Sequence, residues 1–368
     1  MRGLYVHIPF CRTICTYCDF VKEVGTLQKR GRYLEALMKE IVMVEASLSD
    51  VQTLYFGGGT PSLYDPEALK ILLQTIHARV DPKHVVETTI ECNPEDVTAS
   101  FAQGIKALGI DRVSLGVQTF QPTLLDFLHR KHTAETAINA MRHLRLAGFT
   151  RISIDMISGL MGQTMPMLED DLKQLLHLEP DHVSYYSLIL EENTRLWHLM
   201  RRGLVTPIDE DLEADMIETV VQTLKHAGYE HYEISNFARP NQASRHNLLY
   251  WQDEDYVGVG AGAHGRIGAK RHENIHSVKH YIEAIEAGRL PRVRTVPVEG
   301  MKEALMMGLR LTRGVSLEQL EKRYGQPVYA THPRLLEARQ LGLLEEVAGF
   351  LRFTSRGRML GNEVLTRL

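Results

Sequence analysis

The chain has 368 residues, of which 44% are hydrophobic, and a formal net charge of -4 at pH 7. This length is enough for one barrel-sized domain and a smaller one, and the slightly acidic balance argues against a general nucleic-acid binder. No run approaches the ~20 consecutive apolar residues that cross a bilayer, and no apolar signal core follows Met1. We therefore expect a cytoplasmic protein, with peripheral contact to a membrane left open.

The first two hundred residues alternate between short apolar or β-branched runs and helical patterns. Strands are predicted at 4–8, 51–56, 87–91, 112–117, 151–156 and 182–188. Helices are predicted between them at 33–48, 66–80, 100–108, 122–148 and 165–178. Strands separated by helices pair in parallel through right-handed crossovers, so this α/β pattern predicts an open, partial (β/α)6 TIM-like barrel.

In such a barrel the chemistry lies at the carboxyl ends of the strands. Each of the first five predicted strands ends in a polar, glycine-rich or cysteine-rich segment. These segments are the loop 11–18, the turn 57–60, Glu91, Gln118 and Asp155. Ordinary loop capping by polar side chains explains any one of them and is a weaker explanation for all five together.

Three of the 4 cysteines stand in one short loop as Cys11, Cys15 and Cys18, and the fourth is Cys92. A disulfide framework would distribute its cysteines in pairs, so this grouping favours a metal or cluster site. The spacing C-x3-C-x2-C has no matching second pair for tetrahedral zinc, although His7 is a conceivable fourth ligand. Thiolates also hold [4Fe–4S] clusters, and three of them leave one iron open for a further ligand.

The cysteine spacing, with the aromatic Tyr17 before the last cysteine, resembles the radical S-adenosylmethionine superfamily. In that superfamily the open iron binds S-adenosylmethionine, and one electron from the cluster cleaves it to a 5′-deoxyadenosyl radical. The resemblance therefore implies a [4Fe–4S] cluster on Cys11, Cys15 and Cys18, with S-adenosylmethionine as a second cofactor. The radical chemistry belongs to the cofactors, and the protein places them and excludes side reactions.

Four segments narrow the resemblance: YVHIPFC at 5–11, GGGTP at 57–61, ECNP at 91–94 and GVQTF at 116–120. Together they resemble the oxygen-independent coproporphyrinogen III oxidase family, which includes the HemW haem chaperones. The resemblance implies that one set of residues contacts S-adenosylmethionine on the cluster: Tyr5, Tyr17, Gly58 and Glu91. A second set matches positions that hold another S-adenosylmethionine in the oxidase: Gly59, Thr60, Gln118, Arg130 and Asp155. A fold can also retain the second set for structure alone.

Two departures separate this chain from the oxidase. The oxidase has a further cysteine two places after the third, where this chain has Phe20. The oxidase also has an N-terminal extension, whereas here the first strand is predicted from Leu4. Both departures favour the HemW-like branch and put dehydrogenase activity in doubt.

A second informative stretch lies beyond the barrel, after a helix predicted at 210–227. Residues 246–251 read H-N-x-x-Y-W, similar to the signature of the haem chaperone branch. Imidazole suits haem iron, and aromatic surface suits a porphyrin. The resemblance thus implies a haem site formed by His246, Asn247, Tyr250 and Trp251. By residue type alone, a histidine near a Tyr-Trp pair is more typical of core packing.

Residues 260–265 fit the pattern G-x-G-x-x-G, but we predict neither a strand before them nor an apolar helix after them. A dinucleotide site is therefore not expected, and the segment is interpreted as a tight turn at the mouth of the barrel. The role of His264 is left open. The neighbouring His231, His272 and His276 lack ligand spacing and are interpreted as solvated or packed.

From residue 298 the pattern changes to helices at 301–313, 316–324 and 333–340, followed by a hairpin at 343–354. This order resembles a small winged-helix-like α+β domain. The acidic Glu345 and Glu346 and the absence of a basic stripe favour a domain or partner surface over DNA binding. The predicted units are 1–200 for the barrel, 201–297 for its extension and 298–368 for this last domain.

Three functions follow from these features. The leading one is a haem chaperone that takes haem as cargo and delivers it to haem-requiring proteins, including respiratory proteins at the membrane. The second is radical oxidative decarboxylation of coproporphyrinogen III. The third is a binding protein whose metal is purely structural. No nucleic-acid partner is expected, and a homodimer is left open.

Overall fold

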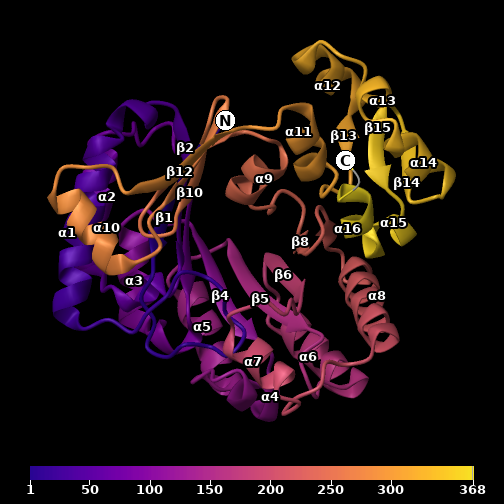
Figure 1. Cartoon of the computed structure of the whole chain (residues 1–368). Helices are drawn as coiled ribbons and strands as arrows, with labels where there is room; N and C mark the ends of the chain where they lie inside the picture. The colour runs from indigo at the N-terminus through magenta and orange to yellow at the C-terminus, as the bar shows by residue number, and fades with distance from the viewer. Residues whose placement is uncertain (367) are drawn as a thin grey trace.

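Six parallel strands in sequence order organise the fold. The computed structural model describes every residue except 367. The six strands are β1 (Arg2–Ile8), β2 (Val51–Gly58), β3 (Glu87–Cys92), β4 (Arg112–Gln118), β5 (Ile152–Ser158) and β6 (His182–Ser187). Each pairs in parallel with the next, and further strands extend the sheet at both edges (Figure 1). The predicted partial (β/α)6 barrel is confirmed.

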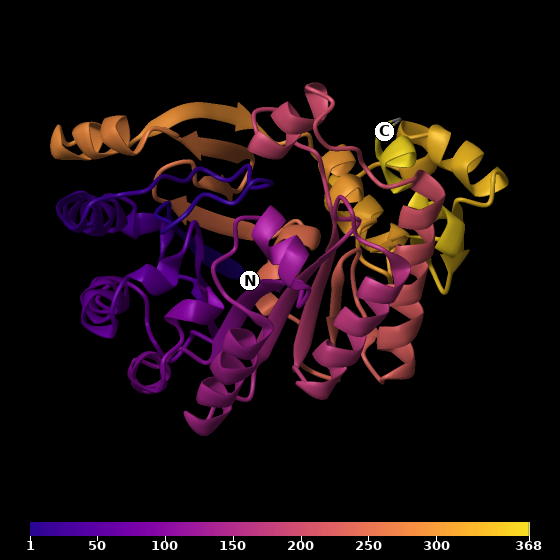
Figure 2. The same cartoon turned by 90° about the horizontal axis from the view of Figure 1, so that it is seen from below.

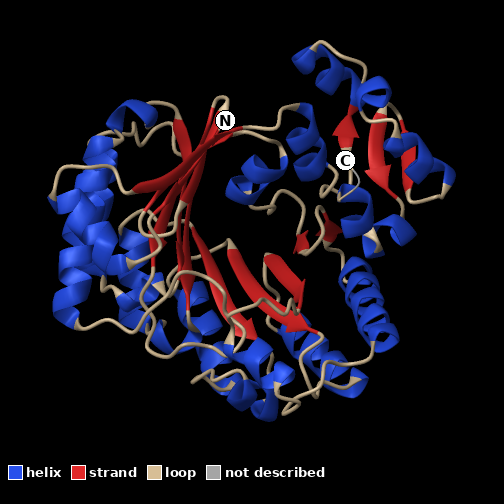
Figure 3. Ribbon diagram, in the orientation of Figure 1, coloured by secondary structure: helices blue, strands red, loops and turns tan. Residues whose placement is uncertain are grey.

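Helices cover the outer face of these strands (Figure 3). They are α1 (Leu27–Met43), α2 (Pro66–His77), α3 (Ala99–Ala107), α5 (Ala134–Leu146) and α6 (Met165–His177). Thr26, Asp65 and Thr98 begin the first three, because each side chain accepts a hydrogen bond from a backbone N–H of the first turn. Among the described residues, no helix is both long and apolar enough to cross a membrane.

Two of the helices predicted within the barrel differ clearly from the structure. The single helix predicted over 122–148 is wrong: α4 (Pro122–Phe127) ends, and α5 starts again at Ala134. His129 adopts a φ of 59° in the break, and Thr133 opens α5 with a capping box to Thr136. The helix predicted from residue 33 begins at Leu27 instead, because Thr26 caps a polar first turn that has no apolar periodicity.

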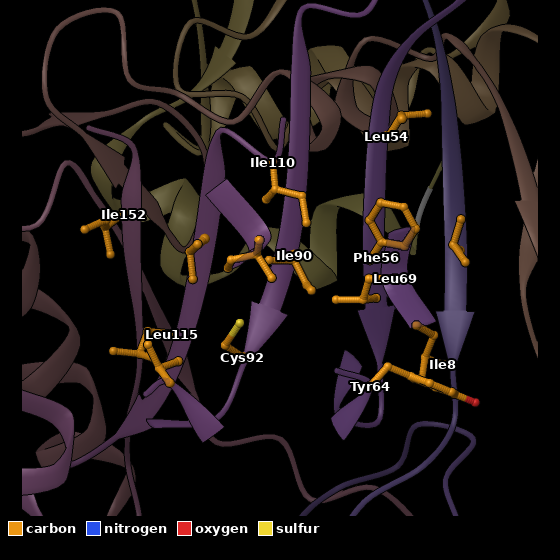
Figure 4. Close-up of a cluster of buried hydrophobic side chains, with 14 of the residues drawn as sticks. Ile8, Leu54, Phe56, Tyr64, Leu69, Ile90, Cys92, Ile110, Leu115 and Ile152 are labelled. Carbon is orange, nitrogen blue, oxygen red and sulfur yellow. The ribbon is translucent and has the colours of Figure 1, made fainter. Parts of the chain in front are cut away.

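Alternation along the strands separates an apolar outer face from a polar inner face. The outer face packs against the helices in a cluster that includes Leu54, Phe56, Ile90, Leu115 and Ile152 (Figure 4). On the inner face Ser114 donates to Asp155 at 2.9 Å, and Ser153 and His182 hydrogen-bond at 2.7 Å. The barrel interior therefore consists largely of hydrogen-bonded polar groups.

Additional strands extend the sheet beyond the barrel. β9 (Asp255–Val259) pairs in parallel with β1, and β10 (His264–Ile267), β11 (Lys270–Asn274) and β12 (Arg292–Pro297) follow in antiparallel order. Beyond β6 lie β8 (Asn236–Ala238) and β7 (Glu230–His231). The expectation that no strand precedes Gly260 is wrong, since β9 ends one residue before it. A strand rather than a helix follows the turn, so the segment is not a strand–turn–helix dinucleotide fold.

Four more helices lie between β6 and the C-terminal unit: α7 (Arg195–Arg201), α8 (Glu210–His226), α9 (Arg245–Trp251) and α10 (Val278–Glu286). In the views of Figure 1 and Figure 3, α9 lies between the strands of the barrel and the C-terminal helix α11 (Met301–Gly308). Helix α10 packs beside α1 on the outside of the sheet. The middle region thus reaches both the barrel and the C-terminal unit.

The C-terminal residues form a small α+β unit with its own core (Figure 2). Its sheet has the order β13-β15-β14, and its core includes Leu305, Val328 and Leu351. The elements after α11 are β13 (Val315–Ser316), α12 (Leu317–Tyr324), α13 (Val328–Thr331), α14 (Arg334–Gln340), β14 (Leu344–Val347), β15 (Phe350–Phe353), α15 (Ser355–Met359) and α16 (Gly361–Leu365). The helix predicted over 301–313 stops at Gly308, because the backbone of 311–312 turns to bond with 232–233 instead.

Candidate cluster and cofactor site

A pocket of about 480 Å3 opens at the carboxyl ends of the barrel strands. Volumes of about 300–1,000 Å3 are typical of small-molecule sites. Eleven of the residues singled out from the sequence line it: Cys11, Cys15, Tyr17, Cys18, Gly58, Gly59, Thr60, Glu91, Gln118, Arg130 and Asp155. The structure thus brings together segments that are far apart in the sequence, as expected for the ends of parallel strands.

Tyr5 is not among the residues that line this pocket. Its hydroxyl hydrogen-bonds to Nδ1 of His7 at 2.9 Å, and its ring packs against Tyr55 with centroids 6.0 Å apart. Tyr5 therefore supports the strand that delivers the cysteine loop, and in this structure its hydroxyl is already engaged.

The cysteine loop is held by backbone hydrogen bonds on three sides. The N–H of Cys11 donates to the carbonyl of Glu23 at 3.0 Å, which closes the loop on itself. The N–H of Thr16 donates to the carbonyl of Leu128 at 3.3 Å, and the carbonyl of Thr16 accepts from Leu196 at 2.9 Å. The ends of α4 and α7 thus fix the middle of the loop, so the three thiols face the pocket on a braced segment.

The donor set fits a cluster better than a single metal ion. Among the described residues, only one group of three potential metal ligands has its donor atoms within 4.8 Å of one another. Cys11, Cys15 and Cys18 are not that group. Both ring nitrogens of His7 are engaged in hydrogen bonds. Nδ1 bonds to the hydroxyl of Tyr5, and Nε2 bonds to the carbonyl of Val21 at 2.8 Å. The fourth cysteine, Cys92, also borders the pocket, but it is only 3% exposed and packs with Ile90 and Leu115 in the hydrophobic core (Figure 4). No fourth ligand therefore closes a tetrahedral zinc site at this loop within the described chain.

The charge around the thiols also suits a cluster. Burial raises the pKa of Cys11 to about 11 and raises the pKa of Cys18, so a bound cation must replace their protons. Arg130 reaches the loop from the break between α4 and α5, and its Nη1 donates to Sγ of Cys15 at 3.7 Å. The buried guanidinium offsets the negative charge of ligating thiolates.

The glycine turn after β2 and the end of β3 form the neighbouring wall. Gly58 has a φ of 115°, and its N–H donates to Oε2 of Glu91 at 3.0 Å. Tyr55 donates its hydroxyl to Oε1 of the same carboxyl at 2.8 Å. Burial raises the pKa of Glu91 to about 7. Glu91 is thus a fixed acceptor in the pocket that loses its proton readily when a cation approaches.

A second polar wall lies across the ends of β2, β3 and β4. Arg130 donates from Nη2 to Oδ1 of Asn93 at 3.0 Å and also bonds the carbonyl of Gly116. Asn93 donates in turn to Oγ1 of Thr60 at 3.3 Å. Gln118 ends β4 with a φ of 71°, which turns the chain toward the pocket. These bonds give the wall a structural role whether or not it holds a second ligand.

The H-N-x-x-Y-W segment lies at the other end of the barrel. It forms α9, in which His246 is completely buried. The ring of His246 contacts Thr53 near the start of β2. Nδ1 of His246 hydrogen-bonds Thr53 at 2.8 Å, and Nε2 hydrogen-bonds the hydroxyl of Tyr250 at 2.8 Å. The ring also stacks on Tyr55 with centroids 5.0 Å apart. Both nitrogens are occupied, so the structure offers no free lone pair of His246 to haem iron.

The other residues of this segment are also engaged in packing. Glu87 at the start of β3 accepts from the N–H of His246 at 3.0 Å and of Arg245 at 3.1 Å, which anchors the helix N-terminus. Arg310 of the C-terminal unit stacks over the ring of Trp251 at 5.4 Å. The segment therefore packs against the barrel strands and joins them to the C-terminal unit. It does not line the cysteine pocket.

Several pocket residues were missed from the sequence. Ser114 and Asn93 line the cavity, and so do five residues at and after the end of β6: Tyr186, Ser187, Leu188, Ile189 and Glu191. These last residues follow the same rule as the first five strands, because sites gather at the carboxyl ends of parallel strands and β6 ends here. Ser114 could have been found by the period of two along β4, because it points to the same face as Gly116 and Gln118.

The fold and the three-cysteine pocket define a radical S-adenosylmethionine protein. Residues 5–175 match the radical SAM superfamily, and residues 297–360 match the HemN C-terminal domain. The chain is 38% identical over 371 residues to the heme chaperone HemW of Bacillus subtilis, covering 99% of this chain and 98% of that protein. It is 37% identical to the heme chaperone HemW of Lactococcus lactis, covering 100% and 97%. The chain belongs to the HemW family.

The structural comparison agrees with this assignment at the level of the fold. The coproporphyrinogen III oxidase HemN of Escherichia coli superposes with a TM-score of 0.86 and 23% sequence identity, covering 100% of this chain and 89% of that one. Membership of the radical SAM superfamily implies a [4Fe–4S] cluster and S-adenosylmethionine, and the donor set described above fits both groups.

Proposed function

We propose that this protein is a haem chaperone, which binds haem and passes it to haem-requiring proteins. The observation that carries the proposal is the mouth of the cysteine pocket, where Phe20 and Ile189 expose 66% and 69% of their surface. Ile14 beside them is 43% exposed. An apolar rim of this kind suits a flat, largely apolar ligand such as a porphyrin. The names of the HemW relatives support the same cargo.

The pocket residues have distinct tasks when the cofactors are bound. Cys11, Cys15 and Cys18 would hold the cluster, which supplies an electron and an open iron for S-adenosylmethionine. Glu91 is placed to orient that ligand, because its carboxyl lines the pocket and is held in place by the N–H of Gly58. Tyr17 lines the same pocket. The chain's own contribution is placement, charge balance and exclusion of water.

The set predicted from the second S-adenosylmethionine of the oxidase has a supporting role in this proposal. Gly59, Thr60, Gln118 and Asp155 line the same pocket as the cysteine loop, and Arg130 spans from Asn93 to Cys15. A second ligand, or an edge of the porphyrin, would meet these polar groups. Equilibrium binding of S-adenosylmethionine to the cluster-loaded protein distinguishes the two cases. Two equivalents indicate a second S-adenosylmethionine at these groups, and one equivalent leaves them to the porphyrin.

The proposal is tested by titrating haem into the cluster-loaded protein under anaerobic conditions. We expect one haem per chain and transfer to an acceptor apoprotein. Phe20→Ala and Ile189→Ala each weaken binding, because they remove exposed apolar contact. Leu146→Ala is the matched control: Leu146 is 79% exposed at the end of α5 and does not line the pocket. Haem affinity that is equal in all three variants would contradict a haem site at this rim.

Oxidative decarboxylation of coproporphyrinogen III is the second candidate, and the fold likeness to the oxidase favours it. An anaerobic assay with S-adenosylmethionine and a reductant tests it directly. Protoporphyrinogen formed over many turnovers would support the enzyme, whereas haem transfer without it supports the chaperone. The acceptors are proposed to include membrane-bound respiratory proteins, which would bring this chain to the membrane surface as a peripheral partner.

A further inference from the structure

We propose that His264, Glu273 and His276 form a binding site for one divalent first-row transition-metal ion, separate from the cysteine loop. One nitrogen of each ring and one carboxylate oxygen lie within 4.8 Å of one another. Two histidines and a carboxylate are a ligand set that Zn2+, Fe2+ and Co2+ accept, with further positions left for water. No other trio of histidine, cysteine, aspartate or glutamate in the described chain comes as close together.

The sheet extension places the three ligands. His264 opens β10 and stands directly opposite Glu273 of the antiparallel strand β11. Side chains of such a pair lie on the same face of a sheet, a few ångströms apart. His276 follows Glu273 by three residues, and its Nε2 hydrogen-bonds Oε1 of Glu273 at 2.6 Å. Two strands and the turn after them therefore converge on one point.

A buried network holds the backbone on either side of these ligands. The carboxyl of Glu40 accepts from the N–H of Gly260 at 2.7 Å and from Nδ2 of Asn274 at 2.7 Å. Tyr281 donates its hydroxyl to the same carboxyl at 2.6 Å, and the N–H of Asn274 donates to the carbonyl of Ala263 at 2.9 Å. Ala263 and Asn274 are the chain neighbours of His264 and Glu273. The ligand-bearing backbone is thus fixed before any ion arrives, which favours metal binding.

The imidazole of His264 is available. Its side chain is exposed, and within the described chain it makes no hydrogen bond, in contrast to the fully engaged ring of His246. The one acidic partner of His276, Glu273, is itself a ligand. A metal ion would take the place of the hydrogen atom shared by His276 and Glu273, and both side chains would then bind the ion.

Two positive side chains near the site oppose a cation: Arg271, which acts on His264, and Arg294. Arg294 of β12 stands opposite Glu273 in the sheet, on the same face as the proposed site. Its positive charge repels a divalent ion, so its removal should tighten binding. A surface histidine that binds metal ions adventitiously elsewhere would not respond to this change.

The test is a competition titration of Zn2+ against a chromophoric chelator, with the cluster-loaded full chain under anaerobic conditions. We expect one equivalent at this site, with affinity lowered roughly tenfold or more in His264→Ala and in His276→Ala. His280→Ala is the matched control, because His280 is an exposed histidine one turn further along in α10. Arg294→Gln should tighten binding several-fold. Co2+ in place of Zn2+ should give ligand-field absorption that His264→Ala removes.

Cluster content and haem affinity are measured on every variant to separate this site from the proposed haem function. Unchanged cluster and haem values beside weakened Zn2+ binding support the proposal. Zn2+ affinity in His264→Ala equal to that of the unaltered chain overturns it. Loss of haem with unchanged Zn2+ affinity in His264→Ala also overturns it, because the residue would then belong to the haem site.

Discussion

The backbone N–H of Gly58 donates to Oε2 of Glu91 at 3.0 Å, and this bond joins the ends of two neighbouring strands inside the cofactor pocket. Gly58 can make the bond only in its left-handed conformation, with a φ of 115°. A Cβ at this position would lie 2.6 Å from Cε1 of His7. Both the strand-end geometry and the place of the carboxyl therefore depend on a residue without a side chain.

Replacement of Gly58 by alanine should lower stability and disturb S-adenosylmethionine binding together. We expect a loss of about 2 kcal/mol or more, because strain at positive φ adds to the clash with the His7 ring. Gly109→Ala is the control, since Gly109 has a φ of 84° but open space around a Cβ, so strain alone should cost about 1 kcal/mol. Chemical unfolding and the shift of the cluster spectrum on adding S-adenosylmethionine are the measurements. Equal losses in the two variants would refute the proposed clash.

The cluster should depend on three of the cysteines and not on the fourth. Replacement of Cys11, Cys15 or Cys18 by alanine removes one of the three thiol ligands that the loop brings to the pocket, so iron and sulfide content should fall close to zero. Cys92→Ala leaves the ligands intact and removes only a small buried group, at a cost of about 1–2 kcal/mol in stability. A cluster lost in Cys92→Ala while the fold is retained would make Cys92 a ligand.

His246→Ala should act on stability rather than on haem. The change removes a completely buried ring and leaves the Thr53 hydroxyl without its partner, so we expect a loss of about 3 kcal/mol. Haem stoichiometry should be unchanged in the folded variant at low temperature, because neither ring nitrogen is free to reach iron. If haem is lost while the unfolding midpoint is unaltered, His246 belongs to the haem site, as the sequence motif implied.

The buried carboxyl of Glu40 should make stability depend on pH. Burial raises its pKa from 4.5 in the unfolded chain to about 7, so the folded state binds the proton more tightly. The favourable contribution is complete below about pH 4.5 and is lost as pH rises through 7. Relative to Glu40→Gln, the free energy of unfolding of the unaltered chain should therefore fall by about 2–3 kcal/mol between pH 5 and 8. Urea unfolding at several pH values measures the difference, and a constant difference would contradict the raised pKa.

Much of the site was predictable because its signals are local. The spacing of Cys11, Cys15 and Cys18 and the period of two along the strands are properties of short segments. Strand–helix alternation then places the strand ends at one edge, so Glu91, Gln118 and Asp155 could be assigned to one site before the structure was known. The helix break at 128–133 was not visible in the same way, because a polar turn inside a long amphipathic pattern resembles an exposed helix face.

By itself the sequence determined the cysteine loop, the open barrel and the family, since each depends on residues that lie close together in the chain or on recurring patterns. Only the tertiary structure decided what the histidines do. His246 is closed off by Thr53 and Tyr250, whereas His264 is brought to Glu273 and His276 by the pairing of β10 with β11. The physical reason is that a side chain's partners depend on sheet register and on which helix covers which face, and both are set by packing of the whole chain.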